Sequence, residues 1–161
     1  MPIQIGERLP SVVLKRIGTS GVEDVPTGEF FAGRRVVLFC VPGAFTPTCH
    51  KEHLPGYIAR ADEIRSKGVN EIVCLAVNDP FVMKAWGEAL GAPGKVTLLS
   101  DWNAEFVRAL GLDQSIVPSG LGVRGRRFSM LVNDGVVETL DVEPARGVSV
   151  SGAEACLLNL D

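Results

Sequence analysis

Cys49 is the residue of this chain best placed to act as a nucleophile. It follows a turn-rich stretch at residues 42–48, which itself follows the apolar run at residues 35–41. That run is typical of a strand buried on both faces, and Pro47 suits the first turn of a helix. We therefore expect Cys49 at a helix start, where unpaired N–H groups and the helix dipole favour the reactive thiolate.

Residues near Cys49 could complete a site that breaks an oxygen–oxygen bond. Such a reaction needs an aligned substrate and stabilisation of the negative charge that develops on the leaving oxygen. The Thr46 hydroxyl and the backbone N–H groups of Thr48 and Cys49 can hydrogen bond to the reacting atoms. Pro42 has no N–H and can shield the pocket from water, while Arg127, at the start of a predicted strand, is the candidate for a fixed positive charge.

The other three cysteines, Cys40, Cys74 and Cys156, are predicted to be packing residues. Cys40 and Cys74 lie in apolar strand patterns, and Cys156 lies in an apolar helical segment. The four cysteines contain no CxxC pair and form neither a zinc pattern nor a disulfide framework. We expect free thiols of a reducing compartment, with one of them reactive.

The order of elements predicts an α/β fold. The expected strands are 35–41, 71–77, 96–99, 128–132 and 136–142, and the expected helices cover about 54–64, 80–90, 103–110 and a last segment from Ser151. A peripheral hairpin from 12–14 and 23–25 precedes them. Asn133-Asp134-Gly135 is a strong hairpin signal. The mixture of crossovers and a hairpin is typical of a thioredoxin-like fold with a mixed central sheet flanked by helices, in a single domain over residues 1–161.

Two local signals refine the helices. Pro55 interrupts the helical pattern after Cys49, and we expect it to kink that helix or weaken its first turns. Ser151, with Glu154 one turn later, predicts a capping box at the start of the last helix.

Charge and hydropathy exclude several classes of partner. The formal net charge of −3 argues against nucleic acid or an anionic membrane as the main partner. The apolar runs are of strand length, far below the ~20 residues of a spanning helix, and the N-terminus shows no secretory pattern. We expect a cytoplasmic protein, and the mature form of an organellar protein is an alternative.

His50 and His53 follow Cys49 closely but predict neither a hydrolase nor a metal site. A four-coordinate zinc site would need a third and a fourth ligand, and the sequence offers none at a suitable spacing. No metal and no cofactor are therefore expected. Both histidines are interpreted as surface or packing residues, and His53 could at most tune the site. Gly120-x-Gly122-x-x-Gly125 does not open a helix after a strand, and is interpreted as a tight loop.

The segment Pro42-Gly43-Ala44-Phe45-Thr46-Pro47-Thr48-Cys49 closely resembles the peroxiredoxin motif Pro-x-x-x-Thr-x-x-Cys, in its type II or peroxiredoxin-five-like form. The resemblance continues at residues 77–86, 120–124 and 126–129 and so covers nearly the whole chain. It implies that Pro42, Thr46, Cys49 and Arg127 are the catalytic four. Arg127, directly before Phe-Ser, matches better than Arg126, which stays a minor alternative.

The resemblance also implies a reaction and partners. Cys49 would attack hydrogen peroxide or a small alkyl hydroperoxide and become a sulfenic acid. Cys74 matches the second cysteine of plant-like members and is a possible resolving residue; the animal-like position falls near Val150. If Cys74 is buried, glutathione with glutaredoxin, or thioredoxin, would do the resolving.

A homodimer would use the loops that carry Phe45, Phe81, Trp86 and Leu121, which are candidates for apolar surface around the pocket; the alternative for these side chains is the intramolecular core. Two other functions stay open. One is a peroxide sensor or relay on the same scaffold. The other is a thioredoxin-like disulfide oxidoreductase, against which the missing CxxC weighs.

Overall fold

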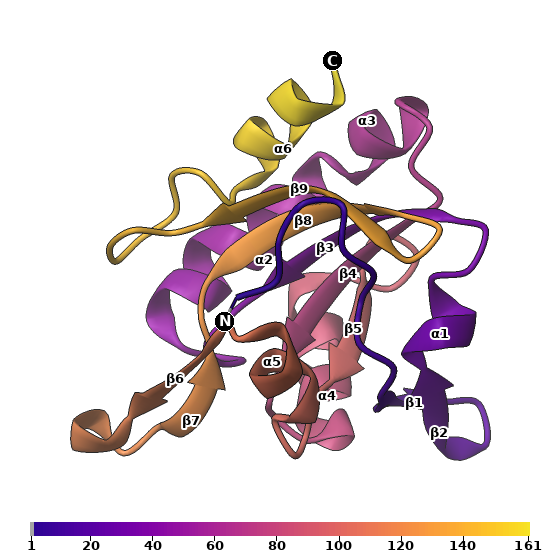
Figure 1. Cartoon of the computed structure of the whole chain (residues 1–161). Helices are drawn as coiled ribbons and strands as arrows, with labels where there is room; N and C mark the ends of the chain where they lie inside the picture. Colours follow the sequence, from indigo (N-terminus) through magenta and orange to yellow (C-terminus); the bar gives the residue numbers. More distant parts are fainter. Residues whose placement is uncertain (1) are drawn as a thin grey trace.

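A mixed sheet forms the centre of the structure, a computed structural model that describes residues 2–161 (Figure 1). Its seven strands run in the order β2-β1-β5-β4-β3-β8-β9. The strands are β1 (Val13–Gly18), β2 (Gly21–Pro26), β3 (Arg35–Cys40), β4 (Glu71–Ala76), β5 (Thr97–Ser100), β8 (Phe128–Asn133) and β9 (Val136–Val142). Strands β3, β4 and β5 are parallel, and the pairs β3–β8, β8–β9, β1–β2 and β1–β5 are antiparallel.

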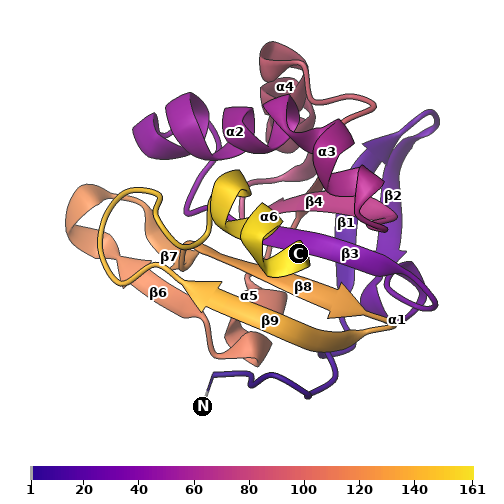
Figure 2. The ribbon, with the colours of Figure 1, turned by 90° about the horizontal axis from the view of Figure 1, so that it is seen from above.

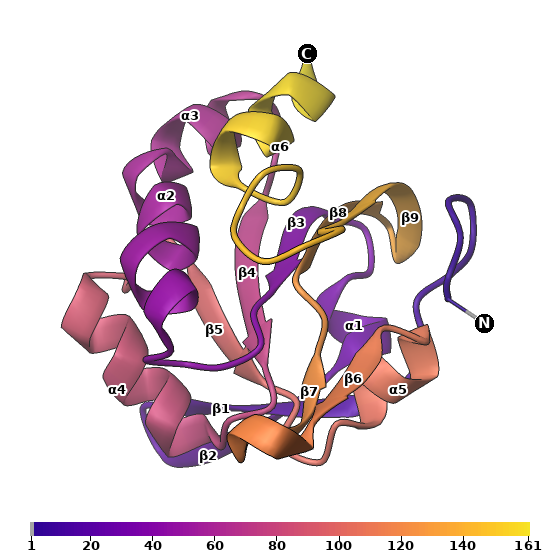
Figure 3. The same ribbon diagram turned by 90° about the vertical axis from the view of Figure 1, so that its left-hand side faces the viewer.

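Helices cover both faces of this sheet. They are α1 (Thr27–Phe30), α2 (Leu54–Ala59), α3 (Ala61–Ser66), α4 (Pro80–Leu90), α5 (Glu105–Leu110) and α6 (Ala153–Leu160). Helices α2, α3, α4 and α6 lie on one side and α5 on the other (Figure 3). From above, α6 lies over β3 and β8 (Figure 2).

The alternation of side chains along the central strands produces two cores. In β3, Val37 and Phe39 pack under α2, α3 and α4, whereas Val36 and Leu38 pack on the α5 side. All four are fully buried or nearly so. This explains why the β3 sequence is a continuous apolar run, and it leaves the carboxyl end of β3 as the place from which the Cys49 loop departs.

The predicted mixed sheet flanked by helices is confirmed, and so is the thioredoxin-like character of the fold. The early hairpin exists as β1 and β2, paired from Val13–Pro26 to Gly18–Gly21. Asn133-Asp134-Gly135 joins β8 to β9, with Asp134 and Gly135 at positive φ as such a turn requires.

Two expectations are wrong. The last helix begins at Ala153, not Ser151, and its N-cap Gly152 has no side-chain cap, so the capping box does not form. The Ser151 hydroxyl is instead bonded to Glu143. The glycine-rich stretch is not only a loop: β6 (Asp113–Ile116), the 3₁₀ turn η2 (Val117–Ser119) and β7 (Gly122–Gly125) form a second hairpin.

Candidate active site

Cys49 lies at the start of a helical segment, as the sequence predicts. The N–H of His50 donates to the Thr46 carbonyl at 2.9 Å, so the N–H groups of Thr48 and Cys49 precede the first helical bond. Cys49 then opens η1 (Cys49–His53), a π-helical turn in which the N–H of Leu54 donates to the Cys49 carbonyl. π-Turns are frequent at functional sites.

Pro55 stands directly after this π-helical turn. Proline offers no N–H to the turn before it and its ring crowds the preceding carbonyls. The predicted disturbance of the helix is therefore present: the segment from Cys49 onward is a π-turn followed by the short helix α2.

The loop before Cys49 is held by its own hydrogen bonds. The Thr46 hydroxyl donates to the Gly43 carbonyl at 2.6 Å, and the N–H of Ala44 donates to Oδ1 of Asn78 at 2.8 Å. Phe45 has a φ of 63°, a conformation that non-glycine residues adopt at a cost. The loop therefore stores local strain beside Cys49.

Arg124 fixes the other end of this loop. Its Nη1 donates to the Pro42 carbonyl at 3.1 Å and its Nε donates to the Leu121 carbonyl at 2.8 Å. A Cβ on Gly43 would stand 2.9 Å from Nη1 of Arg124. The absence of a side chain at Gly43 is what lets the guanidinium reach Pro42.

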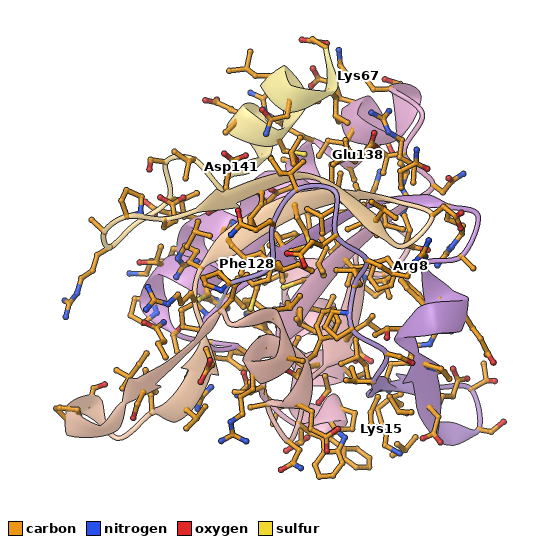
Figure 4. The ribbon with its side chains drawn as sticks, in the orientation of Figure 1. Arg8, Lys15, Lys67, Phe128, Glu138 and Asp141 are labelled. Carbon is orange, nitrogen blue, oxygen red and sulfur yellow. The ribbon has the colours of Figure 1, made fainter. Side chains whose placement is uncertain are left out.

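Arg127 reaches Cys49 from the segment directly before β8, the strand next to β3. Its Nη2 donates to Sγ of Cys49 at 3.1 Å, and its Nη1 lies 2.8 Å from Nδ1 of His53. The register Cys40–Phe128 across β3 and β8 explains this, because Arg127 precedes Phe128 and therefore faces the end of β3. Phe128 itself is fully buried (labelled in Figure 4).

His53 is buried and neutral. Burial lowers its pKa to about 4, despite the hydrogen bond to the Ser151 carbonyl that acts in the opposite direction; Arg127 lowers it further. Nε2 lies 2.9 Å from that carbonyl, so the imidazole donates from Nε2 and its Nδ1 is left to accept from Arg127. One guanidinium thus bridges the Cys49 sulfur and a neutral histidine.

A second set of contacts holds the Ser151 carbonyl in place. The Tyr57 hydroxyl donates to it at 2.7 Å. The Ser151 N–H and hydroxyl both donate to Oε2 of Glu143, at 2.8 and 2.6 Å. Partial burial opposes the Glu143 charge, but the hydrogen bonds from Ser149 and Ser151 outweigh it and lower the pKa to about 2. The carboxylate is therefore charged at all ordinary pH values.

A pocket of about 480 Å³ lies beside these groups. Pro42, Thr48 and Arg127 line it, together with part of β6 and the loop after β9. Both of those segments extend from the same side of the sheet (Figure 1). Cys49 itself is 1% exposed, so the thiol is enclosed rather than lying on the open surface.

The other cysteines are buried free thiols, which agrees with the prediction that they are packing residues. Cys74 is 0% exposed in the middle of β4, and burial raises the pKa of the Cys74 and Cys40 thiols well above the ordinary value. Burial also raises the pKa of Cys156 to about 11. None of the three has the environment of an ionised, accessible nucleophile.

The structure brings together most of the residues that the sequence singles out. Pro42 and Thr48 line the pocket with Arg127, whose guanidinium reaches Cys49. The exposed Arg126 also lines the pocket, but no hydrogen bond joins it to Cys49 in residues 2–161. The Thr46 hydroxyl is bonded to Gly43, so only its oxygen lone pairs remain for another partner.

Sequence reasoning underestimated His53 and left Trp86 open between the pocket surface and the core. His53 was expected to be a surface or packing residue, whereas its ring contacts Arg127 directly; its position one turn after Cys49 was the available signal. Trp86 is 0% exposed and belongs to the core, with its indole N–H donating to His50. Of the proposed apolar surface, Phe45 and Phe81 are exposed.

Within residues 2–161, no group of three or more histidine, cysteine, aspartate or glutamate side chains could hold a metal ion. No helix of the same residues is both long and apolar enough to cross a membrane.

A cysteine at a helix start in a thioredoxin-like sheet, bonded to a half-buried arginine, defines a redox protein that works through a thiol. Residues 4–157 match the Redoxin family model, in agreement with that class.

The curated relatives and solved structures narrow the class. The chain is 49% identical over 160 residues to the chloroplastic peroxiredoxin-2E-2 of Oryza sativa subsp. japonica, with 96% of this chain and 71% of the relative covered. It is 47% identical to a peroxiredoxin of Synechocystis, covering 88% and 79%. The reduced Prx3 of Vibrio vulnificus, solved in complex with H₂O₂, superposes with a TM-score of 0.95 at 46% identity over 99% of both chains. The chain belongs to the peroxiredoxin family, in its type II branch, and is a thiol-dependent peroxidase.

Proposed function

We propose that Cys49 is the peroxidatic cysteine of a single domain over residues 1–161 that reduces hydrogen peroxide and small alkyl hydroperoxides. The observation that carries this proposal is the 3.1 Å hydrogen bond from Nη2 of Arg127 to Sγ of Cys49. The guanidinium is a fixed positive charge beside the sulfur, and the thiolate is the form of a cysteine that attacks.

In the reaction, Sγ of Cys49 attacks the terminal oxygen of the hydroperoxide. The sulfur–oxygen bond forms as the oxygen–oxygen bond breaks, and the bonding pair leaves with the second oxygen. Cys49 becomes a sulfenic acid, and the released hydroxide or alkoxide takes a proton to give water or an alcohol.

The surrounding groups stabilise this transfer. The Arg127 guanidinium can follow the negative charge from sulfur to the leaving oxygen. The backbone N–H groups of Thr48 and Cys49 can bind the peroxide oxygens, since they precede the first helical hydrogen bond. The Thr46 oxygen can accept a hydrogen bond from the peroxide O–H, because its own proton is donated to the Gly43 carbonyl. Pro42 excludes water.

The sulfenic acid is then reduced by a second thiol. Cys74 is a conditional resolving residue, because at 0% exposure in the centre of β4 it needs local unfolding to reach Cys49. An external thiol, from glutathione with glutaredoxin or from thioredoxin, requires only that the short helical segment around Cys49 opens. The π-turn and Pro55 support such opening.

We further propose that the protein acts as a homodimer in the cytoplasm or, as a mature form, in an organelle. The exposed Phe45 and Phe81 are the candidates for such a dimer face. Chloroplastic relatives support the organellar alternative. Size-exclusion chromatography with light scattering tests the dimer.

Peroxide consumption by the purified protein and its Cys49→Ser variant tests the central proposal. Thiol-dependent loss of hydrogen peroxide should vanish in Cys49→Ser and persist in Cys156→Ser, the matched control. Equal rates in the wild type and Cys49→Ser would refute the role of Cys49. Turnover of Cys74→Ser with thioredoxin and with glutathione plus glutaredoxin tests the resolving step: wild-type rates with both remove Cys74 from the mechanism.

A further inference from the structure

The pocket beside Cys49 is far larger than hydrogen peroxide requires. Its volume is about 480 Å³, whereas a water-sized molecule occupies ~30 Å³ and small organic ligands occupy pockets of roughly 300–1,000 Å³. The site therefore has room for an organic group attached to the peroxide.

The lining of this pocket carries an excess of positive charge. Arg126, Arg127 and Arg146 line it, and Glu143 is the one acidic residue among the described residues that do so. The overall chain, by contrast, has a net charge of −3. The pocket is thus a cationic site in an acidic protein, and such a site attracts anions.

Two of these arginines are not used by the peroxidatic site. Arg127 is engaged by Cys49 and His53, and the Glu143 carboxylate is engaged by Ser149 and Ser151. Arg126 and Arg146 are exposed, and within residues 2–161 neither guanidinium makes a hydrogen bond or ion pair. Guanidinium groups present paired donors that match a carboxylate.

The remaining lining is mixed. Pro42, Ile116, Pro144 and Ala145 contribute hydrocarbon surface, whereas Thr48, Gln114 and Ser115 contribute polar side chains. A ligand that fits this lining has an anionic end and a short organic body with some hydrocarbon surface.

We propose that this pocket selects organic hydroperoxides that carry a carboxylate, and that Arg126 and Arg146 bind that carboxylate while the peroxide faces Cys49. The proposal rests on the proposed function of Cys49. The thiolate attacks the terminal peroxide oxygen, the oxygen–oxygen bond breaks, and the sulfur is oxidised to sulfenic acid. The alkoxide that leaves takes a proton from water, so the product is a hydroxy acid.

The test compares two probes in the oxidation half-reaction alone. One probe is a tertiary alkyl hydroperoxide with a carboxylate three carbons from the peroxide, and the other is its methyl ester. Rapid mixing of reduced protein with each, followed by thiol trapping and mass spectrometry, measures the rate at which Cys49 is oxidised. We expect the wild type to prefer the carboxylate by about tenfold at low salt, since a cationic cleft raises on-rates by 10–10³.

The variant Arg126→Gln/Arg146→Gln should lose this preference while its rate with hydrogen peroxide stays unchanged. Arg108→Gln is the matched control, because it removes one exposed arginine that does not line the pocket, and it should keep the preference. A wild type without a preference, or a double variant that keeps it, would overturn the proposal. So would an equal fall in the rates with all peroxides.

Glutathione is a second source of carboxylates, and a separate arm distinguishes it. Cys49 is first oxidised with hydrogen peroxide, and its reduction by glutathione is then followed. If the double variant slows only this reduction, the arginines serve the reductant and the proposal is wrong. If the wild type consumes hydrogen peroxide no faster than Cys49→Ser does, the proposed function itself fails, and this outcome is distinct from a missing preference for the carboxylate.

Discussion

Nδ1 of His53 lies 2.8 Å from Nη1 of Arg127, whose other terminal nitrogen is 3.1 Å from the Cys49 sulfur. The guanidinium is thus fixed from both sides, by the Cys49 thiol and by a neutral imidazole. The imidazole is in turn bound to the Ser151 carbonyl. This chain of contacts connects the loop after β9 to the reacting sulfur.

Replacement of Arg127 should impair the attack on peroxide more than any other single change except loss of Cys49. For Arg127→Gln we expect the second-order rate constant with hydrogen peroxide to fall by about 100-fold, the usual cost of removing one charge-stabilising donor. The rate constant of Arg127→Lys should lie between those of Arg127→Gln and the wild type. Lysine keeps the positive charge, but its ammonium group cannot bridge two partners as the planar guanidinium does. Stopped-flow kinetics measure both, and a wild-type rate in Arg127→Gln would contradict the assignment.

His53 should act as a positioning residue for Arg127. His53→Phe keeps the packing against Phe39 but removes the acceptor, and we expect the rate with hydrogen peroxide to fall by about tenfold, as hydrogen bonds to charged groups contribute ~1.5–3 kcal/mol. His53→Asn places an oxygen near the position of Nδ1 and should recover most of the rate. Equal losses in the two variants would show that His53 only fills space.

Stability should fall as the pH drops from 6.5 towards 4. His53 in the unfolded chain takes up a proton near its ordinary pKa of 6.5, whereas the folded protein keeps it neutral down to about 4. The unfolded state binds more protons in that window, so lowering the pH favours unfolding, by up to about 3 kcal/mol.

Urea unfolding at pH 7 and at pH 4.5 measures this effect. The difference between the two pH values should be smaller in His53→Asn by about 2 to 3 kcal/mol, because that side chain does not titrate. The Glu143 contribution affects both proteins alike and begins only below its ordinary pKa of 4.5. The same pH difference in both proteins would contradict the prediction.

Gly43→Ala should act through Arg124. The new methyl group would stand 2.9 Å from Nη1 of Arg124, so that the guanidinium must leave the Pro42 carbonyl. We expect a loss of about 1 kcal/mol in the free energy of unfolding, the typical net worth of one hydrogen bond. In an Arg124→Ala background, Gly43→Ala should lower the free energy of unfolding by less, because the guanidinium that it would meet is absent. Urea unfolding measures both losses. If they are equal, the strain comes instead from Thr46, whose Cγ2 would lie 3.1 Å from the new methyl group.

Local sequence determined the position of Cys49 at a helix start and most of the elements. The apolar run of β3, the turn residues after it and Pro47 identify the start of the helical segment that carries Cys49, because strand, turn and cap preferences act between near neighbours. The same reasoning fails for the capping box at Ser151, whose hydroxyl has a stronger partner in Glu143.

Only the tertiary structure decided which distant residues meet Cys49. The register that pairs Cys40 with Phe128 brings Arg127 to the sulfur, while Arg126 lines the pocket without a bond to it. His53 lies one helical turn after Cys49 in the sequence. Its contact with Arg127, however, depends on the pairing of β8 with β3, which brings Arg127 to this end of the sheet. Contacts of this kind arise from strand order and register across the whole sheet, which no short stretch of sequence specifies.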